Sequence, residues 1–144
     1  MNFLIVFFGG GLGASLRHGI SIVAARAFGT EFPYGTLIIN VLGSLAMGLI
    51  VEYFALKAGL PQRMRLFLTT GILGGFTTFS AFSLEAALLY ERGAMIGAAV
   101  YIVASVVLAI AALFAATGQD LGLVGTSSMA HGTEPAAAKG PERS

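Results

Sequence analysis

Charged residues and cysteine are what this sequence has least of. Charged residues make up only 10% of the 144 positions, against roughly 25% in an ordinary soluble domain, which argues against a water-soluble monomer. Cysteine is absent, and this excludes a disulfide framework, thiolate zinc sites and cysteine catalysis. Eight Lys and Arg face seven Asp and Glu, a formal charge of +1, so the chain has no basic surface that would bind nucleic acid.

Apolar residues account for most of the chain. They make up 56% of the positions, the mean hydropathy is +0.86, and a bilayer core about 30 Å thick needs roughly 20 of them per helical crossing. We therefore expect an all-α membrane protein in which residues 1–117 form one four-helix transmembrane domain. The polar stretch 118–144 is expected to be a disordered tail. The four apolar runs that predict helices are 3–28, 34–56, 64–90 and 93–117.

Basic residues near the membrane ends give almost no orientational bias. On one side they are Arg26 and Arg92, and on the other Lys57, Arg63 and Arg65. Two against three is too even for the positive-inside rule to fix one topology. Two oppositely oriented copies can pair about a two-fold axis in the membrane plane.

Small residues recur four positions apart, as they do where helix backbones approach closely in membranes. The pairs are Gly9/Gly13, Ser44/Gly48, Gly71/Gly75 and Gly93/Gly97. Within 74–80, two glycines followed by two threonines lower helix propensity at four consecutive positions. Either the third helix is broken here near mid-membrane, with freed carbonyls buried or turned to an ion, or it continues and the threonine hydroxyls bond to carbonyls one turn back.

Uncharged hydrogen-bond donors occur one helical turn apart in the second and fourth apolar runs. Thr36 and Asn40 are one turn apart, as are Tyr101 and Ser105. Asn40 costs several kcal/mol if its amide is left unsatisfied in lipid, so it either bonds a neighbouring helix or donates to a ligand.

Two phenylalanines follow the weak segment. Phe79 and Phe82 share a helix face, and Ser80 and Ser83 share the adjoining one. The rings are either apolar filler or, through their positive edges, the lining of a path for a small anion.

Three charged residues fall inside apolar runs. Arg17 would cost about 2.5–3.5 kcal/mol at mid-helix, so it lies near an interface or lines a wet vestibule. Glu52 and Glu85 either pair with arginine or snorkel, with Arg92 about two turns from Glu85, or they carry protons in a pump. No Ser-His-Asp order, nucleotide-binding loop or paired carboxylates occur, and we expect no enzyme.

These residues resemble the CrcB, or Fluc, family of fluoride channels. The resemblance covers about residues 3–115. It is carried by Gly10-Gly11-Leu12-Gly13-Ala14 followed by Arg17, by Gly35-Thr36 leading to Asn40 and Gly43, and by Gly71-Ile72-Leu73-Gly74-Gly75-Phe76-Thr77-Thr78-Phe79-Ser80-Ala81-Phe82-Ser83.

The resemblance implies an antiparallel, dual-topology homodimer in the bacterial inner membrane, with two fluoride pores and one structural Na⁺ at the centre of the interface. It implies that the carbonyls of Gly75 and Thr78 hold the Na⁺, at the break in the third helix. Two positions depart from the family's pattern: Ala109, where serine is common, and Ala81, where threonine is commoner. The expected fluoride path comprises Thr36, Asn40, Phe79, Phe82, Ser83, Tyr101 and Ser105, with Arg17 as a structural charge.

The implied function is passive fluoride export, which confers fluoride resistance. Neutral donors and ring edges can replace the hydration of a small anion without a fixed cation that would trap it. The alternative is a proton-coupled, four-helix, dual-topology exporter that uses Glu85 or Glu52 as the carrier. A third hypothesis is an assembly subunit without transport activity.

Overall fold

The computed structural model describes residues 1–57 and 61–118, and the regular structure of these residues is helical throughout. Four helical stretches are long and apolar enough to cross a membrane, which confirms the predicted all-α architecture. The tail expected over 118–144 lies outside the described residues, apart from Gly118.

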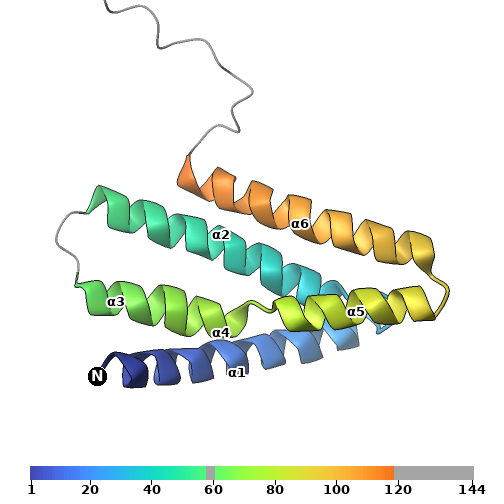
Figure 1. Ribbon diagram of the computed structural model, residues 1–144, viewed down its shortest axis with the longest axis horizontal. Coiled ribbons are helices and arrows are strands. Elements are labelled where there is room, and N and C mark those ends of the chain that lie inside the picture. The colour runs from blue at the N-terminus through green and yellow to red at the C-terminus, as the bar shows by residue number, and fades with distance from the viewer. Residues whose placement is uncertain (58–60, 119–144) are drawn as a thin grey trace, which may run out of the picture.

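Three of the spans are single helices, and the third span is built from several segments (Figure 1). The single helices are α1 (Asn2–Phe28), α2 (Tyr34–Leu56) and α6 (Met95–Thr117). The third span comprises α3 (Gln62–Leu66), the π-helical η1 (Phe67–Leu73), α4 (Gly74–Phe76) and α5 (Phe79–Glu91). The expected bounds 64–90 and 93–117 were therefore off by one or two residues at three of their four ends.

The glycines that belong to the predicted pairs in the first three spans lie where backbones meet. α2 packs mainly on α6, whereas α1 packs on η1 and α4. A Cβ added to Gly9 would lie 2.9 Å from the Cα of Gly71, and one added to Gly48 would lie 2.5 Å from the carbonyl oxygen of Leu113. Such spacing admits no side chain, so these glycines set the helix separations.

The pair Gly93/Gly97 was wrongly expected to do the same. Gly93 lies in the turn before α6 with φ 78°, and nothing lies within 4 Å of the position of its missing Cβ. It is a turn residue in the left-handed region that favours glycine, and it reverses the chain between α5 and α6.

The third span leaves helical geometry at Thr77 and Thr78. Their dihedral angles are φ −76°, ψ 156° and φ −151°, ψ 116°, both extended. The sequence placed the weak segment over 74–80, but only the two β-branched residues are non-helical, and Gly74 and Gly75 remain in α4. Gly75 is pressed against α1, where a Cβ would lie 2.9 Å from the Cα of Gly10, so its role in this protomer is close packing.

Candidate functional site

Asn40 of α2 binds both backbone polar groups of Thr78. Its Nδ2 donates to the Thr78 carbonyl at 3.1 Å, and its Oδ1 accepts from the Thr78 N–H at 2.9 Å. Thr78 is only 7% exposed, so without this side chain its buried N–H would lack a partner, whereas its carbonyl, at the N-cap of α5, also accepts the first bond of that helix. The Asn40 side chain thus provides hydrogen-bond partners for the backbone at the interruption, and the second N–H of its amide takes part in neither of these bonds.

The ends of the interruption are held by local bonds. The Thr77 hydroxyl donates to the Leu73 carbonyl at 3.0 Å, as the continuous-helix alternative had expected of a threonine hydroxyl. The Thr78 hydroxyl accepts from the N–H of Ala81 at 3.2 Å and so caps α5. The Thr77 methyl group fills the space where Gly43 of α2 would carry a Cβ, which explains why glycine suits that position.

A groove of about 350 Å³ opens beside the interruption. It gathers four of the predicted path residues together with Ala109. The Phe79 and Phe82 rings lie 5.4 Å apart between centroids, tilted by 40°, and Phe79 is 78% exposed on the protomer surface. The lining residues are Asn40, Gly43, Ser44, Met47, Thr77, Thr78, Phe79, Phe82, Ser105, Val106, Ala109 and Leu113.

Ser105 contributes a buried hydroxyl to this groove. The residue is 5% exposed, and its Oγ has no hydrogen-bond partner within the described part of the chain. A buried hydroxyl normally has a partner, so this atom can donate to a molecule or ion that enters the groove.

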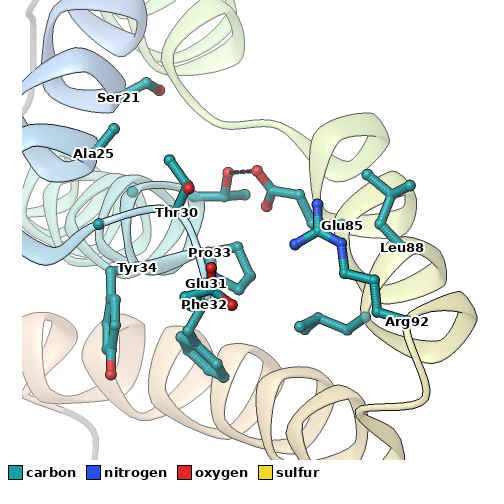
Figure 2. Close-up of a pocket in the computed structure, with 14 residues that line it drawn as sticks. Ser21, Ala25, Thr30, Glu31, Phe32, Pro33, Tyr34, Glu85, Leu88 and Arg92 are labelled. Carbon is teal, nitrogen blue, oxygen red and sulfur yellow. Dashed lines mark hydrogen bonds between the residues drawn. The ribbon is translucent and has the colours of Figure 1, made fainter.

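Glu85 lies at a second cavity and binds two of the predicted donors. The Thr36 hydroxyl donates to its Oε1 at 2.9 Å, and the Tyr101 hydroxyl donates to its Oε2 at 2.8 Å. The cavity holds about 260 Å³ and lies between α1, α2 and α5. Figure 2 shows the first of these bonds to the Glu85 carboxylate as a dashed line, with the Arg92 side chain reaching into the same cavity.

Glu85 was expected to pair with arginine or to snorkel. Its hydrogen-bond partners among the described residues are instead the two hydroxyls. Sequence reasoning did not connect it with Thr36 and Tyr101. The available signal was spacing, because Glu85 follows Phe82 by three positions and so shares its helix face.

The Tyr101 ring links the groove to the second cavity. Tyr101 is fully buried. Its ring lies 5.3 Å from that of Phe82, which lines the groove, and 5.7 Å edge-on from that of Phe32, which lines the second cavity. A continuous set of side chains therefore runs from the groove to Glu85.

Three predicted residues lie away from both cavities. The Ser83 hydroxyl donates to the carbonyl of Phe79, one turn back in its own helix, at 2.9 Å. Ser83 is exposed and lines neither cavity, and the same holds for the half-buried Arg17 and Glu52. The interruption and its groove therefore collect Asn40, Phe79, Phe82 and Ser105, while Thr36 and Tyr101 belong to the Glu85 cluster.

The fold and the two cavities define the class of this molecule, a multi-pass helical membrane protein with polar groups gathered inside its bundle. Residues 4–117 match the family model described as "CrcB-like protein, Camphor Resistance (CrcB)", and the chain belongs to this family.

Three bacterial relatives cover most of the chain. A "Fluoride-specific ion channel FluC" of Rhodopseudomonas palustris (strain BisB5) is 66% identical over 115 residues, 80% of this chain and 93% of that protein. A protein of the same name from Granulibacter bethesdensis is 65% identical over 116 residues, 81% of this chain and 91% of the relative. "Fluoride-specific ion channel FluC 2" of Nitrobacter hamburgensis is 60% identical over 115 residues, 80% and 93% of the two chains.

Proposed function

We propose that this protein is a fluoride-selective channel for passive export of the ion. The observation that carries the proposal is the groove beside Thr77 and Thr78, where amide, hydroxyl and aromatic side chains meet without a charged side chain among the lining residues. The chain belongs to the CrcB family, and relatives 60–66% identical to it are named fluoride-specific ion channels.

The groove offers donors that suit a small, strongly hydrated anion. The second N–H of Asn40 and the orphan hydroxyl of Ser105 are available to donate, and the positive edges of Phe79 and Phe82 complete the set. These groups replace water of hydration, and because none is a fixed cation, the ion can also leave.

Glu85 holds the remaining two donors of the proposed path. The hydroxyls of Thr36 and Tyr101 point at its carboxylate, so each must turn away before it can donate to fluoride. Tyr101 is one helical turn from Ser105, on the side of the second cavity. In this proposal the ion passes from the groove by Ser105 to Tyr101 and leaves through the cavity at Arg92.

The proposed channel is an antiparallel homodimer. The groove opens at the protomer surface, where Phe79 is 78% exposed, so a second copy can complete its wall. The nearly even number of Lys and Arg residues at the two membrane ends, three against two, supports opposite orientations of the copies.

A structural Na⁺ at the interface fits the chemistry of the interruption. Na⁺ takes neutral oxygen ligands, and main-chain carbonyls at helix breaks supply them in membrane proteins. The Thr78 carbonyl accepts one bond from Asn40 and, at the N-cap of α5, the first bond of that helix, so one of these two bonds would give way to the ion. Gly75 lies three residues before it, in the last helical turn. When bound, the cation would add positive potential beside the anion path.

The test is fluoride efflux from liposomes that contain the purified protein, followed with a fluoride electrode. We expect fluoride to leave at least tenfold faster than chloride. Phe82→Ile should slow fluoride efflux at least tenfold, whereas the control Leu84→Ile, at an exposed position of the same helix outside the groove, should not. Equal efflux of the two anions, or an unaffected Phe82→Ile variant, would overturn the proposal.

The proton-coupled exporter is not favoured, because the relatives named above are fluoride-specific ion channels. The two hypotheses separate when the pH is equal inside and outside the liposomes. A channel releases fluoride down its own gradient under that condition, whereas a proton-coupled exporter that uses Glu85 needs the pH difference.

A further inference from the structure

The two ends of the bundle differ in charge. α2 ends and α3 begins at the end where α1 starts, and the turns α1–α2 and α5–α6 lie at the other end (Figure 1). The first end carries three exposed cations, Lys57, Arg63 and Arg65. The second end carries two cations and two anions, Arg26, Glu31, Glu91 and Arg92. Among the described residues, therefore, only the first end is strongly basic.

An apolar groove runs into the membrane from this basic end. It holds about 720 Å³ between the start of α1 and the third span. Leu66 and Thr70 form one wall, and Arg63 precedes Leu66 by three positions, so it lies on the same face at the mouth of the groove. The lining residues are Asn2, Phe3, Leu4, Val6, Phe7, Leu66 and Thr70.

We propose that this end of the bundle binds an anionic phospholipid. Its headgroup phosphate is bound by Arg63, Arg65 adds positive charge from another face of the same short helix, and one acyl chain lies in the groove. Guanidinium groups bind phosphate oxygens in bidentate fashion, and basic residues at the membrane surface attract anionic lipids. The groove itself is almost wholly apolar, so hydrocarbon suits it better than water or a soluble ligand.

A third cation is held at the level of the headgroups. The Lys57 ammonium lies over the Tyr53 ring, 5.2 Å from its centroid, and tyrosine is typical of the membrane–water interface. This contact keeps the positive charge of Lys57 near the end of α2, where it adds to the attraction of Arg63 and Arg65.

Tryptophan fluorescence can test the proposal directly, because the chain contains no tryptophan. Phe3→Trp places one reporter at a groove position that is 91% exposed. The full-length variant is reconstituted into phosphatidylcholine vesicles in which about one lipid in five is brominated, as for a minor anionic component. The brominated lipid is either phosphatidylglycerol or phosphatidylcholine. We expect at least twofold stronger quenching by the brominated phosphatidylglycerol.

Two controls separate specific binding from general contact with lipid. Adding Arg63→Gln and Arg65→Gln to the Phe3→Trp protein should remove the preference and leave equal quenching by the two lipids. Phe28→Trp, an exposed position at the charge-balanced end, should be quenched equally by both lipids in the otherwise unchanged protein.

Three outcomes would overturn the proposal. They are equal quenching of the Phe3→Trp protein by both lipids, a preference that survives both arginine replacements, and absence of quenching by either lipid, which would mean that another copy of the chain covers the groove. Quenching does not depend on ion conduction, so failure here leaves the proposed fluoride channel standing, and failure of fluoride efflux leaves this site standing.

Discussion

Replacing Asn40 by leucine should destabilise the protein because it removes the partner of Thr78. Leucine has the same branched shape and the same number of side-chain heavy atoms as asparagine, so the change leaves no cavity, but it has no polar atom. The Thr78 N–H, which now donates to Asn40 at 2.9 Å, would have no partner in a residue that is 7% exposed. The Thr78 carbonyl would lose the 3.1 Å bond from Asn40 and keep its bond within α5.

The size of the loss distinguishes this arrangement from an ordinary contact between membrane helices. A buried N–H without a partner costs about 1–3 kcal/mol, and the one bond that the carbonyl loses adds about 0.5–1.5 kcal/mol, so the total is about 1.5–4.5 kcal/mol. Interhelical hydrogen bonds in bilayers average only about 0.6 kcal/mol, because the unfolded helices find other partners, and two of them would give about 1.2 kcal/mol.

The assay is equilibrium unfolding of the purified protein in mixed micelles of dodecyl maltoside and increasing sodium dodecyl sulfate, followed by circular dichroism. Ser44→Ala is the matched control, since Ser44 lies one turn further along α2 and lines the same groove. We expect a loss of at least about 2 kcal/mol for Asn40→Leu and less than about 0.5 kcal/mol for Ser44→Ala. A loss of about 1.2 kcal/mol or less for Asn40→Leu, the value for two ordinary interhelical bonds, would refute the view that its amide stabilises the interruption.

Two further predictions use the same unfolding assay. Gly75→Ala should lower the free energy of unfolding by more than about 2 kcal/mol, because the new Cβ would lie 2.9 Å from the backbone of α1. The control Gly11→Ala, with nothing within 4 Å of the added Cβ, should be neutral or stabilising by up to about 1 kcal/mol. Equal effects of the two substitutions would contradict the close packing of Gly75 on α1. Thr36→Val and Tyr101→Phe should each destabilise the protein by about 1–3 kcal/mol, because each removes a hydroxyl that donates to Glu85. Since the two hydroxyls share this carboxylate, the loss in the double variant should differ from the sum of the single losses by more than about 0.5 kcal/mol. Additive losses in the double variant would count against a shared carboxylate.

The helical architecture could be predicted because a membrane-spanning helix is recognised from the composition of its own segment. Each span needs about 20 apolar residues whatever it packs against, and the four expected runs match the observed spans to within a residue or two at most ends. The extent of the interruption was harder to predict. Local propensity marks all of 74–80, but the bonds that stabilise Thr78 come from Asn40, 38 positions earlier, and no local pattern contains such a contact.

The sequence predicted several residues of the candidate site, but not how they are arranged relative to one another. Spacing correctly grouped Phe79 with Phe82 on one helix face, and both line the groove with Asn40 and Ser105. Thr36 and Tyr101 were expected on the same path, but both hydroxyls point at Glu85. Spacing within one helix fixes which residues share a face, whereas the rotation of that helix against its neighbours follows from packing across the bundle, which sequence alone does not give.

The bonds between Asn40 and Thr78 also bear on how the chain is inserted during synthesis. Taken alone, the stretch Gln62–Glu91 is apolar enough over its 30 residues to enter the bilayer as one segment, and in lipid an isolated segment minimises exposed peptide groups by remaining helical. α2 precedes this stretch in the chain, so its amide is already within the membrane when the two threonines leave the ribosome. The bend can therefore form as the third span docks on the second, and folding of this region follows the order of translation.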